Sequence, residues 1–415
     1  MTLRIVNSLG GQKEVFETLE PGKVRMYHCG PTIKEPIHIA KFRSFLLADL
    51  LRRRLEEAGL AVTQVMNITD VGHLNEFEED IVEIAAARTG LYAWELAEKE
   101  ERIFHEDRRA LRVSEASKYP KAREHIDDMI AVIADLEKKG CTYQAGGNVY
   151  FDVSRSRGFG RLARKSVPEL EKQVESGRTP RHPEKRHPLD IDLWRTDALH
   201  QMHWESPWGR GFPGWHVECV AMSRRYLGES FDIHTGTWEN LFPHHECEIA
   251  QAETLSGKPL ARYWLHTGPV NVDGKPMSPQ NKNVITVRQL LDSGFRGEVI
   301  RAALLSAAYR SALDFGETAL DEARERVNTI GGFHAHLATL CGRTASWPAS
   351  AERDPAGWIH ETNEAFRAHL DDDLGYGAAL GAVAGAIEKL EPSGVGDPAQ
   401  ALAALARWDR VLGVL

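Results

Sequence analysis

Cys29, Cys219, His244 and Glu248 have the side chains needed to bind a single zinc ion. Two thiolates, an imidazole and a carboxylate are ligand types that zinc prefers. His244 and Glu248 are four residues apart, so a helix would place both on one face. Cys29 and Cys219 are distant in sequence and must be brought in by the fold. A zinc ion held this way could accept a substrate thiolate far better than a hydroxyl, so the pattern predicts a site that separates cysteine from serine.

These positions also have simpler interpretations. Cys29 alone would be a buried small residue, and His244 beside His245 would be a capped loop pair. A zinc ion that only holds the fold together would need the same four ligands. Cys247 precedes Glu248 on the predicted helix and would point away from the face that carries His244, so we do not count it as a ligand.

The composition is that of an ordinary globular protein. The 415 residues suggest two to three domains, and 42% of them are hydrophobic. We find no uncharged apolar run of eighteen residues, and the N-terminus carries charges where a signal peptide needs an apolar core, so we expect a cytoplasmic protein with no membrane partner. Five sparse cysteines argue against a disulfide framework. The net charge of −9 gives no support for a nucleic-acid partner and does not exclude one.

The first half of the chain predicts a βαβ unit. Residues 1–26 have the pattern of short strands around a Gly-Gly turn, and VRMYHCGPT is a strand that enters a Gly-Pro loop. Residues 39–59 have the pattern of a helix that ends at glycine, and AVTQVMNITD follows as a second strand. Strand, loop, helix and strand in this order begin a doubly wound parallel sheet of Rossmann type.

An insertion is expected to interrupt this sheet. Residues 76–140 are charged and helical by pattern, and NVYFDVSR has strand character. Residues 154–189 are rich in Arg, Lys, Pro and Gly, which predicts a mobile surface segment. We therefore assign residues 1–290 to one α/β domain that contains a helical and loop insertion at 76–189.

Strand patterns return in ESFDIHTG and ARYWLHTGPVNVDG, and the chain then becomes helical. We assign residues 291–415 to a C-terminal helical domain. A linker at residues 342–358, which contains Pro, Ser and Arg, is expected to separate two helical pieces there.

The segment CGPTIKEPIHIAKFR joins the first strand to its helix. Ligands of doubly wound sheets bind at the carboxyl ends of strands, and anions bind at helix N-termini. We therefore expect His38 to point at a bound phosphate. A histidine that only caps the helix is the simpler alternative.

Several long segments together resemble one family. The chain is similar to the cysteinyl-tRNA synthetases and to the related cysteine ligases of mycothiol biosynthesis, which have class I synthetase folds. The resemblance extends from about Val24 to Glu317 and is weaker after that. The segments that carry it are YHCGPT, HIAKFRSFLLADLLRR, NITDVGHL, SPWGRGFPGWHVECVAMS, SFDIH, NLFPHHECEIAQAE and LLSAAYRSALDFGE.

The resemblance implies a role for individual residues. The four residues of the opening pattern match the zinc ligands of the family, and His38 matches the first histidine of its HIGH element, which stabilises charge on the ATP phosphates. The positions implied in substrate binding are Gly30, Thr32, Thr69, Trp215 and His234. The positions implied in ATP binding are His38, Ala40, Gly236, Met277 and Ser278.

The chain departs from the family pattern in its ATP elements. HIGH is His38-Ile39-Ala40-Lys41 here, so a methyl group replaces a glycine hydrogen and a cation follows. In the KMSKS loop, prolines stand where both lysines belong. Lys275 and Lys282 lie close by in sequence and could replace the lost charges, and we count both as catalytic candidates together with His38 and Lys41. HTGTWEN replaces a glycine-rich stretch that packs against adenosine in the family.

The C-terminal end of the sequence is relevant to whether the protein acts on a tRNA. The full-length synthetases continue with a basic segment that helps to bind the anticodon stem, and nothing follows Leu415 in this sequence. We therefore expect the anticodon-binding extension to be absent, which weakens a tRNA role without excluding it. The basic run from Arg155 to Arg186 is either a phosphate contact or, more simply, a solvated loop.

We therefore expect a monomeric ligase that binds Zn²⁺ and uses ATP with Mg²⁺ to activate L-cysteine, or a thiol-bearing derivative of it, as an adenylate. The acceptor would be the 3′ end of a tRNA or the amine of a small molecule. Two alternatives remain open at this point. One is an ATP-independent transfer of a cysteinyl group from tRNA, and the other is a non-catalytic module that binds cysteine through zinc.

Overall fold

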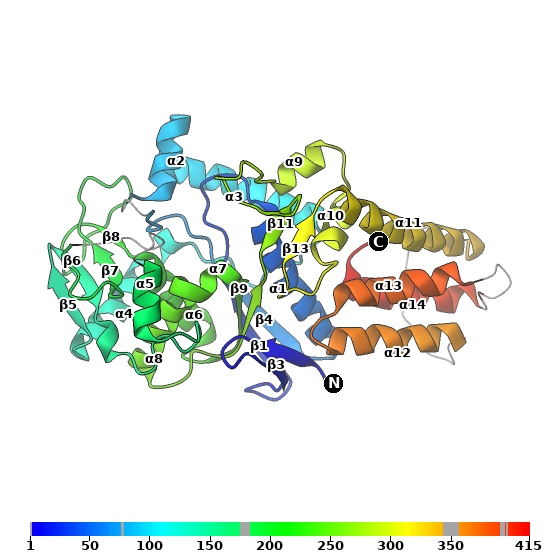
Figure 1. Cartoon of the computed structure of the whole chain (residues 1–415), viewed down its shortest axis with the longest axis horizontal. Helices are drawn as coiled ribbons and strands as arrows, with labels where there is room; N and C mark the ends of the chain where they lie inside the picture. Colours follow the sequence, from blue (N-terminus) through cyan, green and yellow to red (C-terminus); the bar gives the residue numbers. More distant parts are fainter. Residues whose placement is uncertain (1, 76–78, 175–182, 343–356, 391–394, 396) are drawn as a thin grey trace.

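The computed structural model describes residues 2–75, 79–174, 183–342, 357–390, 395 and 397–415. Its centre is a four-stranded sheet (Figure 1). The strands, in spatial order, are β10 (Ala261–Thr267), β9 (Phe231–Thr237), β3 (Lys23–His28) and β4 (Ala61–Met66). All three neighbouring pairs are parallel. The predicted doubly wound α/β fold is therefore confirmed.

Alternate residues of the sheet face two separate cores, as the period of a strand requires. Met26 of β3 belongs to the core on the side of helix α1 (Ile39–Glu57), whereas its neighbour Tyr27 belongs to the core on the other side. Helix α6 (Trp215–Leu227) packs on that second face, and α8 (Glu246–Ser256) packs on α6.

Helix α1 begins where the sequence predicts and is buried along most of its length. The Nδ1 atom of His38 accepts a hydrogen bond from the Lys41 amide, which satisfies one free N–H group of the first turn. The helix ends at Glu57, and the positive φ of Gly59 then turns the chain toward β4. The buried Arg43 guanidinium donates hydrogen bonds to the carbonyl oxygens of Gly268 and Ser311, so α1 also fixes the loops that follow the sheet.

The strand order reverses direction between β3 and β9. The chain leaves β3 through α1 toward β4, and it leaves β9 through α8 toward β10. Such a topological switch point leaves a crevice at the carboxyl ends of the two central strands, where doubly wound proteins bind their ligands.

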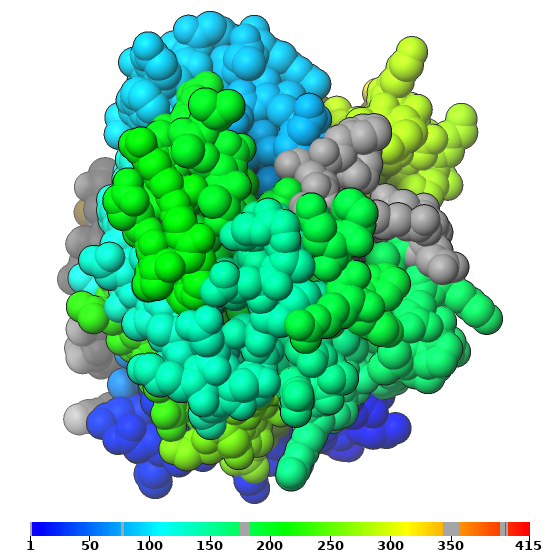
Figure 2. Space-filling model, turned by 90° about the vertical axis from the view of Figure 1, so that its left-hand side faces the viewer, coloured from blue at the N-terminus to red at the C-terminus, as the bar shows by residue number. Residues whose placement is uncertain are grey.

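Most of the segment between β4 and β9 forms a second lobe, on the left of Figure 1, while α3 runs across the top toward the centre. A four-stranded antiparallel sheet lies in it, in the order β5-β6-β7-β8. Figure 2 looks onto this lobe, with α2 at the top. The side chain of Gln201 accepts a hydrogen bond from the first residue of α3, which ties residues 197–202 to the helices. The elements are α2 (Ile81–Thr89), α3 (Ala93–Ala110), η1 (Ala122–Glu124), α4 (Ile126–Lys138), β5 (Thr142–Ala145), β6 (Asn148–Phe151), η2 (Val153–Arg155), α5 (Val167–Gln173), β7 (Ile191–Arg195) and β8 (Phe212–Pro213).

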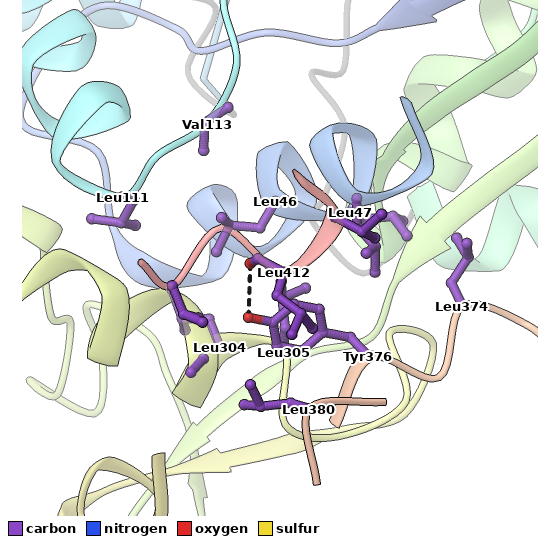
Figure 3. Packing of buried hydrophobic residues seen from close by; sticks show 14 of the residues in the cluster. Leu46, Leu47, Leu111, Val113, Leu304, Leu305, Leu374, Tyr376, Leu380 and Leu412 are labelled. Carbon is purple, nitrogen blue, oxygen red and sulfur yellow. Dashed lines mark hydrogen bonds between the residues drawn. The ribbon is translucent and has the colours of Figure 1, made fainter. Parts of the chain in front are cut away.

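The chain after about Leu290 is mainly helical, as predicted, and lies on the right of Figure 1. One short strand, β13, which the sequence analysis did not predict, pairs in parallel with β11. Figure 3 shows how the leucines of α1, α10 and α14 meet, with the Tyr376 hydroxyl donating to the Leu412 carbonyl at 3.0 Å. The elements are β11 (Val270–Val272), β12 (Lys275–Pro276), α9 (Val287–Asp292), α10 (Gly297–Leu304), β13 (Leu313–Phe315), α11 (Glu317–Leu340), α12 (Gly357–Asp371), α13 (Tyr376–Glu388) and α14 (Pro398–Leu412).

Three small elements complete the fold. The antiparallel hairpin of β1 (Arg4–Asn7) and β2 (Gln12–Val15) lies beside β10. The one-turn helix α7 (Trp238–Asn240) and the π-type turn η4 (Leu241–His245) connect β9 to α8.

Parts of two predicted segments lie outside the described residues. They are residues 175–182 of the basic segment 154–189 and residues 343–356 of the linker. Within the described ranges, no helix is both long and apolar enough to cross a membrane.

Candidate active site

The four predicted metal ligands meet at the carboxyl edge of the central sheet. Cys29 follows β3, Cys219 lies on α6, His244 lies in η4 and Glu248 lies on α8. All four side chains are buried, and one ligand atom from each lies within 4.8 Å of all the others. The fold therefore joins two cysteines that are 190 residues apart in sequence.

Three of the spacings between ligand atoms fit a zinc ion, whereas His244 Nε2 and Glu248 Oε1 lie 2.9 Å apart, at the distance of a hydrogen bond. The Sγ atoms of Cys29 and Cys219 lie 3.8 Å apart, Cys219 Sγ lies 3.5 Å from His244 Nε2, and Cys29 Sγ lies 3.5 Å from Glu248 Oε1. Tetrahedral zinc with Zn–S bonds of about 2.3 Å and Zn–N or Zn–O bonds of about 2.1 Å separates two sulfurs by about 3.8 Å and sulfur from nitrogen or oxygen by about 3.5 Å.

A second set of possible ligands overlaps the first. It shares Cys29 and Glu248 and adds His234 and His245. In this set His245 Nε2 lies 3.1 Å from Cys29 Sγ, and His234 Nε2 lies 2.8 Å from Glu248 Oε2. Both distances are typical of hydrogen bonds, as is the distance between His244 and Glu248 in the first set. We take the first set as the better metal site because it contains both thiolates and three of its spacings fit tetrahedral zinc.

Two of the four ligands, Cys219 and Glu248, have pKa values shifted toward the charged form that a metal needs, whereas burial raises the pKa of the Cys29 thiol. Burial alone would raise the pKa of Glu248, but the charges of His234 and His244 hold it well below its usual value. Burial also opposes ionisation of Cys219, yet the hydrogen bond from Cys29 and the charge of His244 lower its pKa to about 6. A thiolate and a carboxylate are the protonation states that bind zinc.

His234 holds the Glu248 carboxylate in place. Its Nε2–H group donates to Glu248 Oε2 at 2.8 Å, while Oε1 faces Cys29 and His244. The imidazole stacks on Trp264, with ring centroids 4.4 Å apart. His234 therefore orients the Glu248 carboxylate, because a metal-binding carboxylate needs a hydrogen-bond partner for its second oxygen.

Three rings form a stack beside the metal cluster. Trp215 lies between His73 and His244, with centroid distances of 3.8 Å and 4.0 Å. His73 Nδ1 forms a 2.8 Å hydrogen bond with the hydroxyl of Thr32, which forms a β-bridge with Thr69. The stack therefore connects the predicted cysteine-binding residues Thr32, Thr69 and Trp215 to a predicted metal ligand.

A cavity of about 530 Å³ opens above this stack, at the switch point between β3 and β9. It brings together most of the residues predicted from the sequence. Those that line it are Cys29, Gly30, Thr32, His38, Ala40, Lys41, Thr69, Trp215, His244, Met277 and Ser278. Trp238, which is 43% exposed, lies at the same cavity beside Glu239.

His38 and Lys41 differ in charge. Burial and the nearby Lys41 lower the pKa of His38 to about 4, so its imidazole is neutral at pH 7. Burial also lowers the pKa of Lys41. The Nζ atom of Lys41 lies 3.5 Å from Asn240 Oδ1, and no ion pair of Lys41 occurs among the described residues. Lys34, which lines the same cavity, is paired with Glu35 at 2.8 Å.

The loop that bears the two prolines is closed by its own side chains. Asn283 Oδ1 accepts from the Ser278 amide at 2.9 Å, and Asn281 Nδ2 donates to the Pro276 carbonyl at 2.7 Å. The loop therefore forms a preorganised wall of the cavity, in keeping with the stiffness expected of a segment with Pro276 and Pro279.

Four residues singled out in the sequence lie elsewhere. Lys275 and Lys282 are exposed and do not line the cavity. Gly236 lies beneath it, where a Cβ atom would be 2.7 Å from His245 Cε1. Cys247 is buried and lines a second, smaller cavity, separate from the predicted metal ligands, in agreement with its exclusion as a ligand.

Several histidines around the cluster were not predicted from the sequence to lie at the site. His73 lies in the NITDVGHL segment, which was used only for the resemblance, and His266 lies in the β10 pattern. His216 was also missed, and its Nδ1 lies 2.9 Å from His244 Nδ1. The eighteen histidines of the chain were the available signal, but only the tertiary structure shows which of them meet.

The sequence matches a known family model. The family described as "tRNA synthetases class I (C) catalytic domain" matches residues 15–325. A Cysteine--tRNA ligase of Thermococcus gammatolerans is 39% identical over 388 residues, which cover 92% of this chain and 79% of that protein. A Cysteine--tRNA ligase of Geobacter sulfurreducens is 39% identical over 420 residues, which cover 100% of this chain and 85% of that protein.

Solved structures share the fold at low sequence identity. A Mycobacterium tuberculosis methionyl-tRNA synthetase in complex with methionyl-adenylate has a TM-score of 0.63 at 15% identity, and 94% of this chain and 90% of that chain are covered. A LeuRS–tRNA–LeuAMS ternary complex from Agrobacterium radiobacter K84 has a TM-score of 0.66 at 11% identity, with coverage of 96% and 84%. With a class I fold, a matching family model and relatives that are about 40% identical, this chain belongs to the cysteinyl-tRNA synthetase family of class I tRNA synthetases.

Proposed function

We propose that the protein activates L-cysteine with ATP as cysteinyl adenylate and transfers the cysteinyl group to the 3′ end of a tRNA. The relatives named Cysteine--tRNA ligase support this proposal, because they match this chain along 92% or more of its length. We assign the reaction to residues 1–290, with residues 76–189 as an insertion, and treat residues 291–415 as a helical domain.

The observation that carries the proposal is the geometry of the Cys29, Cys219, His244 and Glu248 cluster beside the cavity. A zinc ion held by these four ligands would expand its coordination and accept the substrate thiolate as a fifth ligand, a role that a serine hydroxyl fills poorly. His234 keeps the Glu248 carboxylate oriented through its 2.8 Å hydrogen bond.

Polar groups above the cluster would hold the rest of the amino acid. Thr32 and Thr69 lie side by side at the cavity wall, and His73 fixes the orientation of the Thr32 hydroxyl. Trp215 closes the side of the pocket by stacking on His244.

ATP would occupy the remainder of the cavity, with its phosphates at the N-terminus of α1. His38 caps this helix and is neutral, whereas Lys41 offers an ammonium group to the phosphates. A helix N-terminus and a cation together stabilise anionic oxygens. Ala40, Met277 and Ser278 would form the walls that contact the nucleotide, and Mg²⁺ would accompany the phosphates.

Catalysis then requires positioning and charge stabilisation, with no protein nucleophile. A carboxylate oxygen of cysteine attacks the α-phosphorus of ATP, and the bond from that phosphorus to pyrophosphate breaks. In the second step a ribose hydroxyl of the tRNA 3′ end attacks the cysteinyl carbonyl, and AMP leaves. Lys41 would stabilise the charge that develops on the phosphate oxygens during the first step.

The relatives do not favour an ATP-independent acyl transfer or a non-catalytic cysteine sensor. The test below also distinguishes transfer to a tRNA from transfer to the amine of a small molecule. We further propose a monomer that acts in the cytoplasm, where ATP and tRNA are available.

The test is cysteine-dependent exchange of pyrophosphate into ATP by the zinc-loaded protein, followed by charging of tRNA. We expect exchange with cysteine, little with serine, and labelled tRNA after the second step. Exchange without tRNA charging would redirect the acceptor to an amine. Absence of exchange in a protein that binds one zinc per chain would refute the proposal.

A further inference from the structure

A line of hydrogen-bonded side chains leads from the N-terminal hairpin to Cys29. The Ser8 hydroxyl lies 2.8 Å from His266 Nδ1, and His266 Nε2 lies 2.8 Å from His245 Nδ1. His245 Nε2 in turn lies 3.1 Å from Cys29 Sγ. The two imidazoles are buried, and the four residues come from four separate parts of the chain: the turn after β1, β10, η4 and the residue after β3. The site described above gives Ser8 and His266 no role.

The chemistry of the last atom fixes the direction of the whole line. A metal-bound Cys29 thiolate can only accept, so His245 Nε2 must carry the hydrogen and donate it. A neutral imidazole has one donor and one acceptor nitrogen. His245 Nδ1 therefore accepts from His266 Nε2–H, and His266 Nδ1 accepts from the Ser8 hydroxyl. Each group then selects the tautomer of the next.

The hairpin is built to hold Ser8 in this position. Asn7 Oδ1 accepts from the amides of Leu9 and Trp264, and Asn7 Nδ2 donates to the Arg262 carbonyl. The Ser8 amide donates to the Trp264 carbonyl at 2.8 Å. The turn after β1 is thus fastened to the edge of β10 by both backbone and side chain. Ser8 precedes the family match, which begins at residue 15.

We propose that Ser8 and His266 are positioning residues for the metal site, which fix the tautomer of His245 so that its Nε2–H stabilises the Cys29 thiolate. A donated hydrogen bond disperses the negative charge of a buried thiolate, and partners of this kind change metal affinity by about 10–100-fold. The inference rests on the proposed function, because it takes Cys29 as a metal ligand.

The experiment compares full-length wild-type protein with Ser8→Ala, Ser8→Thr, His266→Phe and His266→Gln. Zinc affinity is measured by chelator competition, and the thiolate-to-metal absorption band is measured after substitution with Co²⁺. We expect His266→Phe to weaken zinc binding about 10–100-fold and to shift the cobalt band. His266→Gln should remain close to wild type, because its amide can donate to His245.

The variants Ser8→Ala and Ser8→Thr test the same inference with a smaller change in packing. We expect Ser8→Ala to weaken zinc binding about 2–10-fold with a smaller band shift, because one neutral hydrogen bond is lost. Ser8→Thr keeps the hydroxyl and should match wild type. Ser230→Ala is the matched control, because its hydroxyl also donates one hydrogen bond, in this case to the Pro259 carbonyl at an exposed turn.

Each outcome has one meaning. If Ser8→Ala and His266→Phe both keep the affinity and the cobalt band of wild type, the inference is overturned. If His266→Phe has a Tm far below that of wild type, the comparison of Ser8→Ala with Ser8→Thr tests the inference instead. Identical zinc affinity and an identical cobalt absorption band in these two variants overturn the inference. If wild-type protein binds neither Zn²⁺ nor Co²⁺, the metal assignment in the proposed function fails instead.

Discussion

Replacing Lys41 by methionine tests how this cavity handles the charge of ATP. Among the described cavity-lining residues, Lys41 is the cationic side chain without an acidic partner, since Lys34 is engaged by Glu35. Methionine keeps an aliphatic stem of similar length beside Phe45, whose ring centroid is 5.7 Å from Lys41 Nζ. The substitution therefore removes the charge with little change in packing.

The magnitude follows from the contacts that Lys41 makes and would make. Its hydrogen bond to Asn240 is long, at 3.5 Å, so its loss should change the free energy of unfolding by no more than about 0.5 kcal/mol. A charge-assisted hydrogen bond to a phosphate contributes about 1.5–3 kcal/mol. At 1.36 kcal/mol per factor of ten, kcat/KM for ATP should fall roughly 10–150-fold.

The assay is cysteine-dependent pyrophosphate exchange at varied ATP concentration. Lys34→Met is the matched control, and its kcat/KM should change less than about threefold because Lys34 already forms a partly exposed ion pair. Lys41→Arg should recover part of the activity, and zinc content should stay unchanged in all variants. The reasoning is refuted if Lys41→Met exchanges normally while the double substitution Lys275→Met, Lys282→Met loses activity, because the loop lysines would then supply the charge.

Three further outcomes are expected. Glu248→Gln should lower the zinc content per chain and reduce zinc affinity at least about tenfold. Removal of the metal from wild-type protein with a chelator should lower Tm reversibly, because a ligand at 1,000 times its Kd adds about 4.1 kcal/mol to the free energy of unfolding. A Tm that does not respond to the chelator contradicts this expectation. Asp49→Asn should cost about 3–5 kcal/mol at pH 7, because Arg301 lies 2.7 Å from Asp49 and would be left buried without a counter-charge. Burial opposes ionisation of Asp49, but the charge of Arg301 lowers the pKa of Asp49 below its value in the unfolded chain. The stability from this ion pair is therefore present above about pH 4 and is lost as pH falls through the lower folded pKa. Urea unfolding at pH 7 and pH 3 should show that the difference in the free energy of unfolding between wild type and Asp49→Asn becomes smaller in acid. Gly236→Ala should cost about 1–3 kcal/mol, because its Cβ would press on the His245 ring, and an unchanged urea midpoint would show that the ring can move away.

The sequence was sufficient for the centre of the fold because local patterns determine it. The strand β3, the helix α1 and the strand β4 each had an unambiguous period, and their order allowed only a parallel crossover. The β5–β8 sheet was seen only in part, because its strands are two to five residues long and its last two come after the basic segment.

The site was predictable where single residues have distinctive chemistry. Two cysteines, a histidine and a glutamate in family-specific segments predicted a cluster that the fold does assemble. The stack of His73 on Trp215 was not predictable, because it joins residues 142 positions apart whose periodic patterns carry no sign of the contact. The exposed position of Lys275 and Lys282 depends on the course of a short loop, which spacing alone does not define.

The separation of Cys29 and Glu248 by 219 positions has a consequence for the nascent chain. At a synthesis rate of about 5–20 residues per second, Cys29 is made roughly 10–45 s before Glu248. For most of that time the partner ligands Cys219, His244 and Glu248 have not been made, and β3 lacks its neighbour β9. Metal loading must therefore wait for the second half of the sheet, so a chain that stalls during translation would expose a reactive thiol in place of a finished metal site.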